Sequence, residues 1–251
     1  MTSQAIADRR NEWFVPSRGP LNVRVLIGLL FLPYTGMVLS YTIIGAMLAE
    51  RIYWDRVGAI VTIYFLALGI GAHALDAVGS KNVKPWGTVF SDGPLWAVAL
   101  SSITIAYTIG IYYMVLYTPL LALIALVEGF FLFAYNLEWF GGRFHTDPWF
   151  AVSWGGLPVL AGYILQTNRL SLMALVVAIS TGLFSLVEIK TSRPYKALRC
   201  RLPTTKTEGD EEQREMLQRY EVILKSLSAA VLLLGIGLLM WRITSPVCSP
   251  S

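Results

Sequence analysis

Two ionisable side chains, His73 and Asp76, end a long apolar run in the stretch GIGAHALDAVGSKNVKPWGTVFSD. Ionisable groups at the end of a membrane helix are costly to place there, which makes them candidates for a functional site. The two residues are three apart, so both lie on one face of a helix and can address one ligand. The polar loop that follows adds the cations Lys81 and Lys84. The alternative is that His73 and Asp76 only cap the helix at the water interface.

A second, weaker copy of this pattern comes later in the chain. Glu188 ends another apolar run and is followed by Arg193-Pro194-Tyr195 and Lys196, as Asp76 is followed by Lys84-Pro85-Trp86. Both copies close an even-numbered apolar run, so we expect both at the same side of a membrane.

Carboxylates beside Lys and Arg at a membrane surface suit a diphosphate ligand. Mg²⁺ is held by one or two carboxylates together with the phosphate oxygens of its ligand, and Lys and Arg pair the remaining charge. We therefore expect Asp76 and Glu188 to bind Mg²⁺, and His73 to be a third ligand or a base. The phosphate-binding groups would be Lys81, Lys84, Arg143, Arg193 and Lys196.

The composition predicts an all-α, polytopic transmembrane helical bundle. Apolar residues make up 55% of the chain and charged residues 14%, with a mean hydropathy of +0.57, whereas about a quarter of a soluble domain is charged. The apolar runs have the length of roughly 20 residues that a bilayer requires. They fall at about 25–48, 57–76, 95–116, 119–137, 149–166, 170–188 and 222–243.

The polar segments complete this domain plan. Residues 1–22 form a polar N-terminal segment, and residues 23–248 form the transmembrane domain with a long polar loop at 189–221. From Glu211 that loop is expected to be helical and to run into the last span. Pro33 and Pro158 predict kinks within their spans. The small net charge of +4 says little about nucleic acid. The expected partners are membrane lipids and no nucleic acid, and the oligomeric state is left open.

Lys and Arg predict the orientation. With the N-terminus in the cytoplasm, sixteen of these residues fall on the cytoplasmic side and only Arg51, Arg56, Arg169 and Arg242 fall outside. The expected protein is therefore an integral, multi-pass membrane protein with a cytoplasmic N-terminus. The polar loops after the second, fourth and sixth spans then share the cytoplasmic side, so we expect them to meet at one cavity, with Asp76 facing Glu188.

This layout resembles the UbiA-type intramembrane prenyltransferases. In that family an acidic motif closes the second helix before an Arg-Pro segment, and a second one closes the sixth helix. Here HALDAVGSKNVKPWGTVFSDGPLWAVAL is similar to the first region, with Asp76 at a motif aspartate, and Glu188 stands near the second. Tyr135, Asn136 and Arg143 follow the fourth span, where the family has a Tyr and a Lys. The resemblance implies a UbiA-like plan, an isoprenoid diphosphate as substrate, Mg²⁺ as cofactor and prenyl transfer to an acceptor.

Two other functions remain open at the level of sequence. His73 and His145 are the only histidines. With Asp76, Glu138 and Asp147 they could form a two-histidine, carboxylate-rich site for iron, manganese or zinc in a membrane oxidoreductase. The Glu138 and Asp147 carboxylates could instead form loop ion pairs. The third possibility is a non-catalytic lipid-binding membrane protein. Glu128 lies inside a span and is either hydrogen-bonded between helices or faces an aqueous cavity; we favour the cavity.

Overall fold

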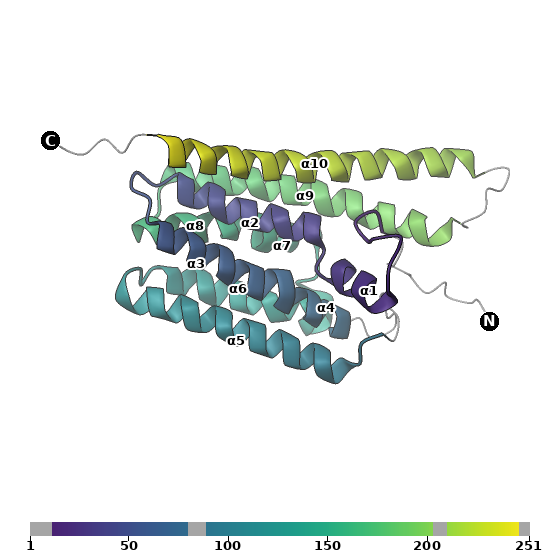
Figure 1. Ribbon diagram of the computed structural model, residues 1–251, viewed down its shortest axis with the longest axis horizontal. Coiled ribbons are helices and arrows are strands. Elements are labelled where there is room, and N and C mark those ends of the chain that lie inside the picture. The colour runs from purple at the N-terminus through teal and green to yellow at the C-terminus, as the bar shows by residue number, and fades with distance from the viewer. Residues whose placement is uncertain (1–11, 80–88, 203–209, 246–251) are drawn as a thin grey trace.

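The structure is a computed structural model that describes residues 12–79, 89–202 and 210–245. Within those ranges the regular elements are all helices, which confirms the all-α class (Figure 1). The candidate residues Lys81 and Lys84 lie outside the described residues.

The helices follow the apolar runs of the sequence. Their bounds are α1 (Leu21–Leu29), α2 (Leu32–Met47), α3 (Trp54–Tyr64), the π-helix η2 (Phe65–Ala72), α4 (His73–Gly79), α5 (Asp92–Leu116), α6 (Leu121–Asn136), the 3₁₀ helix η3 (Trp139–Gly142), α7 (Asp147–Phe150), the π-helix η4 (Ala151–Gly156), α8 (Leu157–Thr167), α9 (Leu172–Arg201) and α10 (Glu211–Thr244).

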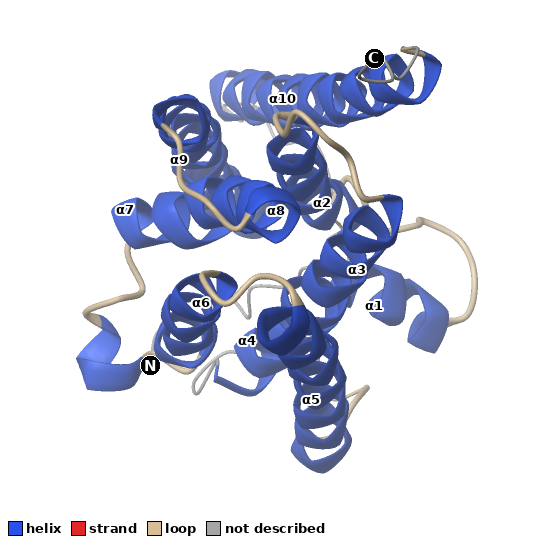
Figure 2. Ribbon diagram, turned by 90° about the vertical axis from the view of Figure 1, so that its left-hand side faces the viewer, coloured by secondary structure: helices blue, strands red, loops and turns tan. Residues whose placement is uncertain are grey.

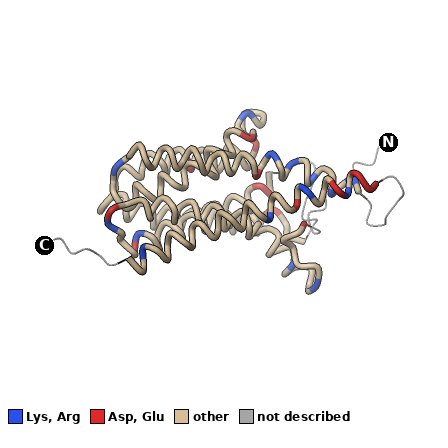
Figure 3. Tube along the Cα trace, turned by 90° about the horizontal axis from the view of Figure 1, so that it is seen from above, with Lys and Arg blue, Asp and Glu red and all other residues tan. Residues whose placement is uncertain are grey.

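Six helical stretches of the described chain are long and apolar enough to cross a membrane. They are 21–47, 54–79, 92–116, 147–167, 172–201 and 211–244. The shorter α6 has 16 residues, about 24 Å at 1.5 Å per residue, against a bilayer core of about 30 Å. Charged residues gather toward the two ends of the bundle (Figure 3). The protein is therefore a multi-pass helical membrane protein.

The outer surface of the bundle is suited to lipid rather than water. Val115, Leu126 and Leu172 are 74%, 72% and 78% exposed, on α5, α6 and α9 respectively. Such a continuous apolar surface would be an aggregation hazard in water but is what hydrocarbon requires.

Close backbone packing fixes the position of α2, which lies between α8 and α10 (Figure 2). A Cβ on Gly45 would collide with the Val159 carbonyl of α8, and one on Gly162 would collide with the Thr42 carbonyl of α2. Small residues on both helices thus let their backbones touch, which is the usual way that membrane helices gain packing energy.

The kink expected at Pro33 is found as a break between α1 and α2. Phe31 has left-handed dihedrals (φ 44°, ψ 49°), and Pro33 lies in the first turn of α2. A bulky residue in this region costs on the order of 1–3 kcal/mol. Thr35 compensates in part, because its hydroxyl donates a hydrogen bond to the Leu30 carbonyl, which the break leaves without a helical partner (2.6 Å).

The sixth helix is longer than the sequence indicated. We expected residues 189–221 to form a loop, but α9 continues through Pro194 to Arg201, and α10 begins at Glu211 as expected. Ile189 and Tyr195 are buried, so tertiary packing of this face outweighs the one backbone hydrogen bond that Pro194 cannot donate.

Candidate functional site

A cavity of about 170 Å³ lies at the end of the bundle where α4 ends and the extended part of α9 begins. Residues of six helices line it, together with Phe31 and His145 from segments between helices, and we call it the head-group pocket. Its lining is Phe31, Tyr34, His73, Asp76, Tyr135, Asn136, His145, Phe150, Trp154, Glu188, Ile189, Ser192, Arg193 and Lys196.

The pocket brings together most of the side chains that the sequence singled out. The segments that meet there follow the second, fourth and sixth spans. The predicted residues in its lining are His73, Asp76, Tyr135, Asn136, Glu188, Arg193 and Lys196. Arg143 is exposed and does not line the pocket. Three of the helices that line the pocket, α4, α6 and α9, thus contribute residues that the sequence had indicated.

His73 is held between two aromatic rings. It follows η2 directly, and its imidazole stacks on Phe31 at 4.7 Å between ring centroids and lies 5.2 Å from Trp154. Its Nε2 is 3.3 Å from the Thr35 hydroxyl. A π-helical turn shifts the register of the residues after it and is frequent at functional sites, so η2 is the local feature that aims His73 at the pocket.

An aromatic wall forms the part of the pocket that the sequence did not reveal. Phe31, Tyr34, Phe150 and Trp154 line it, with Phe150 and Trp154 stacked at 5.5 Å and 13° between ring planes. Trp154 lies in the second π-helix, η4, and Phe150 immediately precedes it. The signal in the sequence was the pair Gly155-Gly156 before Pro158, which marks irregular packing but does not say which aromatic ring turns inward.

The charges of the pocket are arranged in pairs. Glu188 is 5% exposed and has Lys196, further along α9, as its charged neighbour. The Nε atom of Arg193 is 3.0 Å from the Asp147 carboxylate, which also lies 3.6 Å from the Lys190 ammonium. Arg193 lies beside the Tyr135 hydroxyl as well. Asp147 therefore holds Arg193 at the edge of the pocket, where its remaining N–H groups can meet an anion.

His145 enters the pocket but in a different setting from the one expected of a metal ligand. It stacks on Tyr135 at 4.4 Å, and its Nδ1 is 3.0 Å from the Tyr135 carbonyl oxygen. Asp147 is engaged by the two cations described above, and Glu138 is exposed. No three His, Cys, Asp or Glu side chains in the described part of the chain group closely enough to hold a metal ion by themselves.

The donor set fits Mg²⁺ in only one way. Asp76 and Glu188 are the two carboxylates of the pocket, and a cage built by the protein alone needs more oxygen ligands than these. Mg²⁺ that is carried in by a phosphate ligand needs no more than one or two carboxylates, because phosphate and water oxygens complete its octahedron.

Comparison of the chain with protein-family models, with curated proteins and with solved structures finds no match. What the pocket does must therefore be argued from its own residues.

Proposed function

We propose that the protein binds an isoprenoid or related lipid diphosphate in the head-group pocket and transfers the prenyl group to an acceptor. The observation that carries this proposal is the convergence of two carboxylates and two cations on an aromatic pocket at one end of a membrane bundle. The resemblance in layout to the UbiA-type prenyltransferases supports the same reading, and the cytoplasmic side is the side we propose for the pocket.

The residues have separate roles in this proposal. Asp76 and Glu188 would hold Mg²⁺, and Arg193 and Lys196 would pair the remaining negative charge of the diphosphate. When bound, Mg²⁺ would supply positive charge that makes the diphosphate a better leaving group. The bond from the first prenyl carbon to the diphosphate oxygen breaks, the acceptor forms a bond to that carbon, and the acceptor's proton leaves to a base.

The aromatic wall gives this chemistry a physical basis. Phe31 and Trp154 present ring faces beside His73, and ring faces attract positive charge within about 6 Å. The Lys196 ammonium already lies 5.4 Å from the centre of the Phe31 ring. An allylic group that gains positive charge as the diphosphate departs would be stabilised in the same way.

Binding of geranylgeranyl diphosphate to the purified full-length chain, with and without Mg²⁺, tests the proposal. We expect binding to need Mg²⁺ and to weaken at least tenfold in Asp76→Asn and in Glu188→Gln. Glu138→Gln is the matched control, because this carboxylate is exposed near the same end of the bundle and lies outside the pocket.

Binding that survives both pocket substitutions, or an absence of binding by the wild-type protein, would overturn the diphosphate site. Chelation of Mg²⁺ from the wild-type protein gives the same test without any substitution. Binding without transfer to any prenyl acceptor would identify the non-catalytic lipid-binding protein instead.

A further inference from the structure

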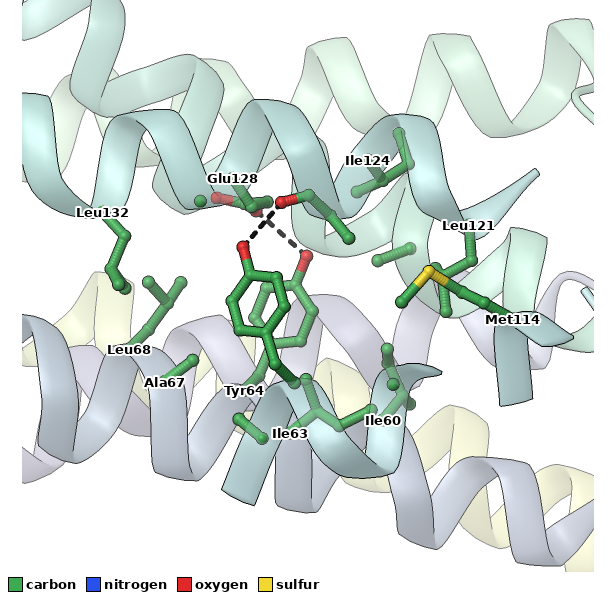
Figure 4. A pocket seen from close by; sticks show the side chains of 16 residues that line it. Ile60, Ile63, Tyr64, Ala67, Leu68, Met114, Leu121, Ile124, Glu128 and Leu132 are labelled. Atoms are coloured by element: carbon green, nitrogen blue, oxygen red, sulfur yellow. Dashed lines mark hydrogen bonds between the residues drawn. The ribbon is translucent and has the colours of Figure 1, made fainter. Parts of the chain in front are cut away.

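A second pocket lies within the membrane-spanning part of the bundle, between α3, η2, α5 and α6 (Figure 4). Its volume is about 70 Å³, and we call it the Glu128 pocket. The wall is made of aliphatic side chains such as Ile60, Leu68 and Leu132, interrupted by Glu128 and by the hydroxyls of two tyrosines. The aqueous cavity that the sequence favoured around Glu128 is therefore not what the structure shows, because these walls are apolar.

Only one oxygen of the Glu128 carboxyl group accepts a hydrogen bond. Its Oε1 accepts a hydrogen bond from the Tyr64 hydroxyl at 2.9 Å, and Figure 4 shows the two side chains pointing toward each other across the pocket. The Tyr107 hydroxyl donates instead to the Ala125 carbonyl at 2.8 Å. Glu128 Oε2 is shielded and has no hydrogen-bond partner. A buried polar atom without a partner costs free energy, so this oxygen favours a ligand that brings a donor.

The pocket is open to the side of the bundle. Tyr64 and Leu132 at its inner wall are buried, whereas Met114, Ile124 and Ala125 on α5 and α6 remain partly exposed. Around these helices the outside is hydrocarbon, so a ligand would enter from the bilayer. The volume has room for a small polar head and the first atoms of a chain, and the rest of the chain would stay among the lipids.

We propose that the Glu128 pocket binds a bilayer-dissolved molecule with an apolar body and a single hydrogen-bond donor, a primary amine or a hydroxyl, which it presents to Glu128 Oε2. A donor head meets the one unpartnered oxygen, and an apolar body meets every other wall. An amine would form a charge-assisted hydrogen bond with the carboxylate, and an alcohol would form a neutral one. The site is separate from the head-group pocket, and it does not depend on the proposed prenyl transfer.

Binding of four twelve-carbon probes to the full chain in phosphatidylcholine nanodiscs tests the site. Dodecylamine and 1-dodecanol carry the donor, whereas dodecane and dodecyltrimethylammonium have the same chain without one. We expect at least one donor-bearing probe to bind at least tenfold above its level in protein-free nanodiscs, and the two donor-free probes to show no such excess. Dodecyltrimethylammonium separates hydrogen bonding from attraction of any cation by the protein.

Substitutions locate the binding and identify the head group. Glu128→Leu removes the acceptor, and Ala67→Leu fills the pocket while leaving the carboxyl in place; both should abolish the excess. Glu128→Gln keeps a polar head but no charge, so it should retain 1-dodecanol and lose dodecylamine. Val127→Ala, next to Glu128 but outside the pocket, should bind like the wild type.

The proposal is overturned if the donor-bearing probes show no excess over dodecane, or if Ala67→Leu binds them as the wild type does. The first result needs no variant and so does not depend on variant folding. Asp76→Asn should leave probe binding unchanged, and Glu128→Leu should leave diphosphate binding unchanged, so failure of one site is distinguishable from failure of the other.

Discussion

Arg193 and Arg143 were both expected from the sequence to bind phosphate, and they allow a comparison of single residues. Arg193 lines the head-group pocket, whereas Arg143 is exposed outside it. A hydrogen bond to a charged group contributes about 1.5–3 kcal/mol. Arg193→Gln should therefore weaken geranylgeranyl diphosphate binding about ten- to a hundredfold, with Asp147 still paired to Lys190. Arg143→Gln should bind within about twofold of the wild type.

Direct titration of the diphosphate into each purified variant measures both constants. Equal losses in the two variants would mean that general positive charge, rather than the geometry of the pocket, holds the ligand. Increasing salt would then weaken the wild type and both variants in parallel, because exposed charges are screened.

Most of the polar residues of the head-group pocket could be predicted from the sequence, whereas its aromatic wall could not. His73, Asp76 and Glu188 stand out because a charge at the end of an apolar run is rare. Phe31 and Trp154 are aromatic residues in a chain that is 12% aromatic, and nothing local distinguishes those that face a cavity from those that face lipid. The left-handed backbone at Phe31 and the π-helix around Trp154 are what direct these two rings into the cavity.

At the scale of helices, the contact between α2 and α8 predicts a sharp difference between two glycines. Gly162→Ala should lower stability by about 1–3 kcal/mol, because overpacking forces the touching backbones apart and a Cβ there meets the Thr42 carbonyl. Gly58→Ala, in α3, has open space around its Cβ. It should be neutral or stabilising by up to about 1 kcal/mol, since alanine is the better helix former.

Thermal unfolding of both variants in the same detergent measures the difference. A midpoint for Gly162→Ala that equals that of Gly58→Ala would contradict the close approach of α2 and α8. The pair is matched in chemistry, since each substitution adds one methyl group to a helix, so the comparison reports on the contact alone.

The ends of the helices are harder to predict than their existence. Hydrophobicity alone located all seven apolar helices, because a helix that crosses a bilayer needs about 20 consecutive apolar residues. It failed at Pro194, where α9 continues with polar residues on one face and a buried side chain at Tyr195 on the other. It also gave no sign that α3 and α4 are joined through a π-helix.

Charged residues lie at both ends of the molecule (Figure 3), but their contacts differ between the two ends. At the end opposite the head-group pocket, arginines close the helices: Arg242 donates to the Met47 and Ala49 carbonyls, and Arg56 donates to the Leu165 and Gln166 carbonyls. Helix ends leave such carbonyls without partners. These two arginines therefore use their N–H groups to stabilise helix ends, whereas Arg193 and Lys196 at the pocket end line a cavity.

The distribution of Lys and Arg predicts that the pocket end faces the cytoplasm, and single cysteines test this in intact cells. With Cys200 and Cys248 replaced by serine, Glu50→Cys and Glu138→Cys place one thiol at each end, both at exposed positions. A membrane-impermeant maleimide should label Glu50→Cys in intact cells and Glu138→Cys only after permeabilisation. The reverse pattern would put the pocket outside. Asp76 and Asn136 line the same pocket, so α6 must bring the chain back across the bilayer. Labelling of both cysteines in intact cells would show that the short α6 does not do so, and would contradict the pocket.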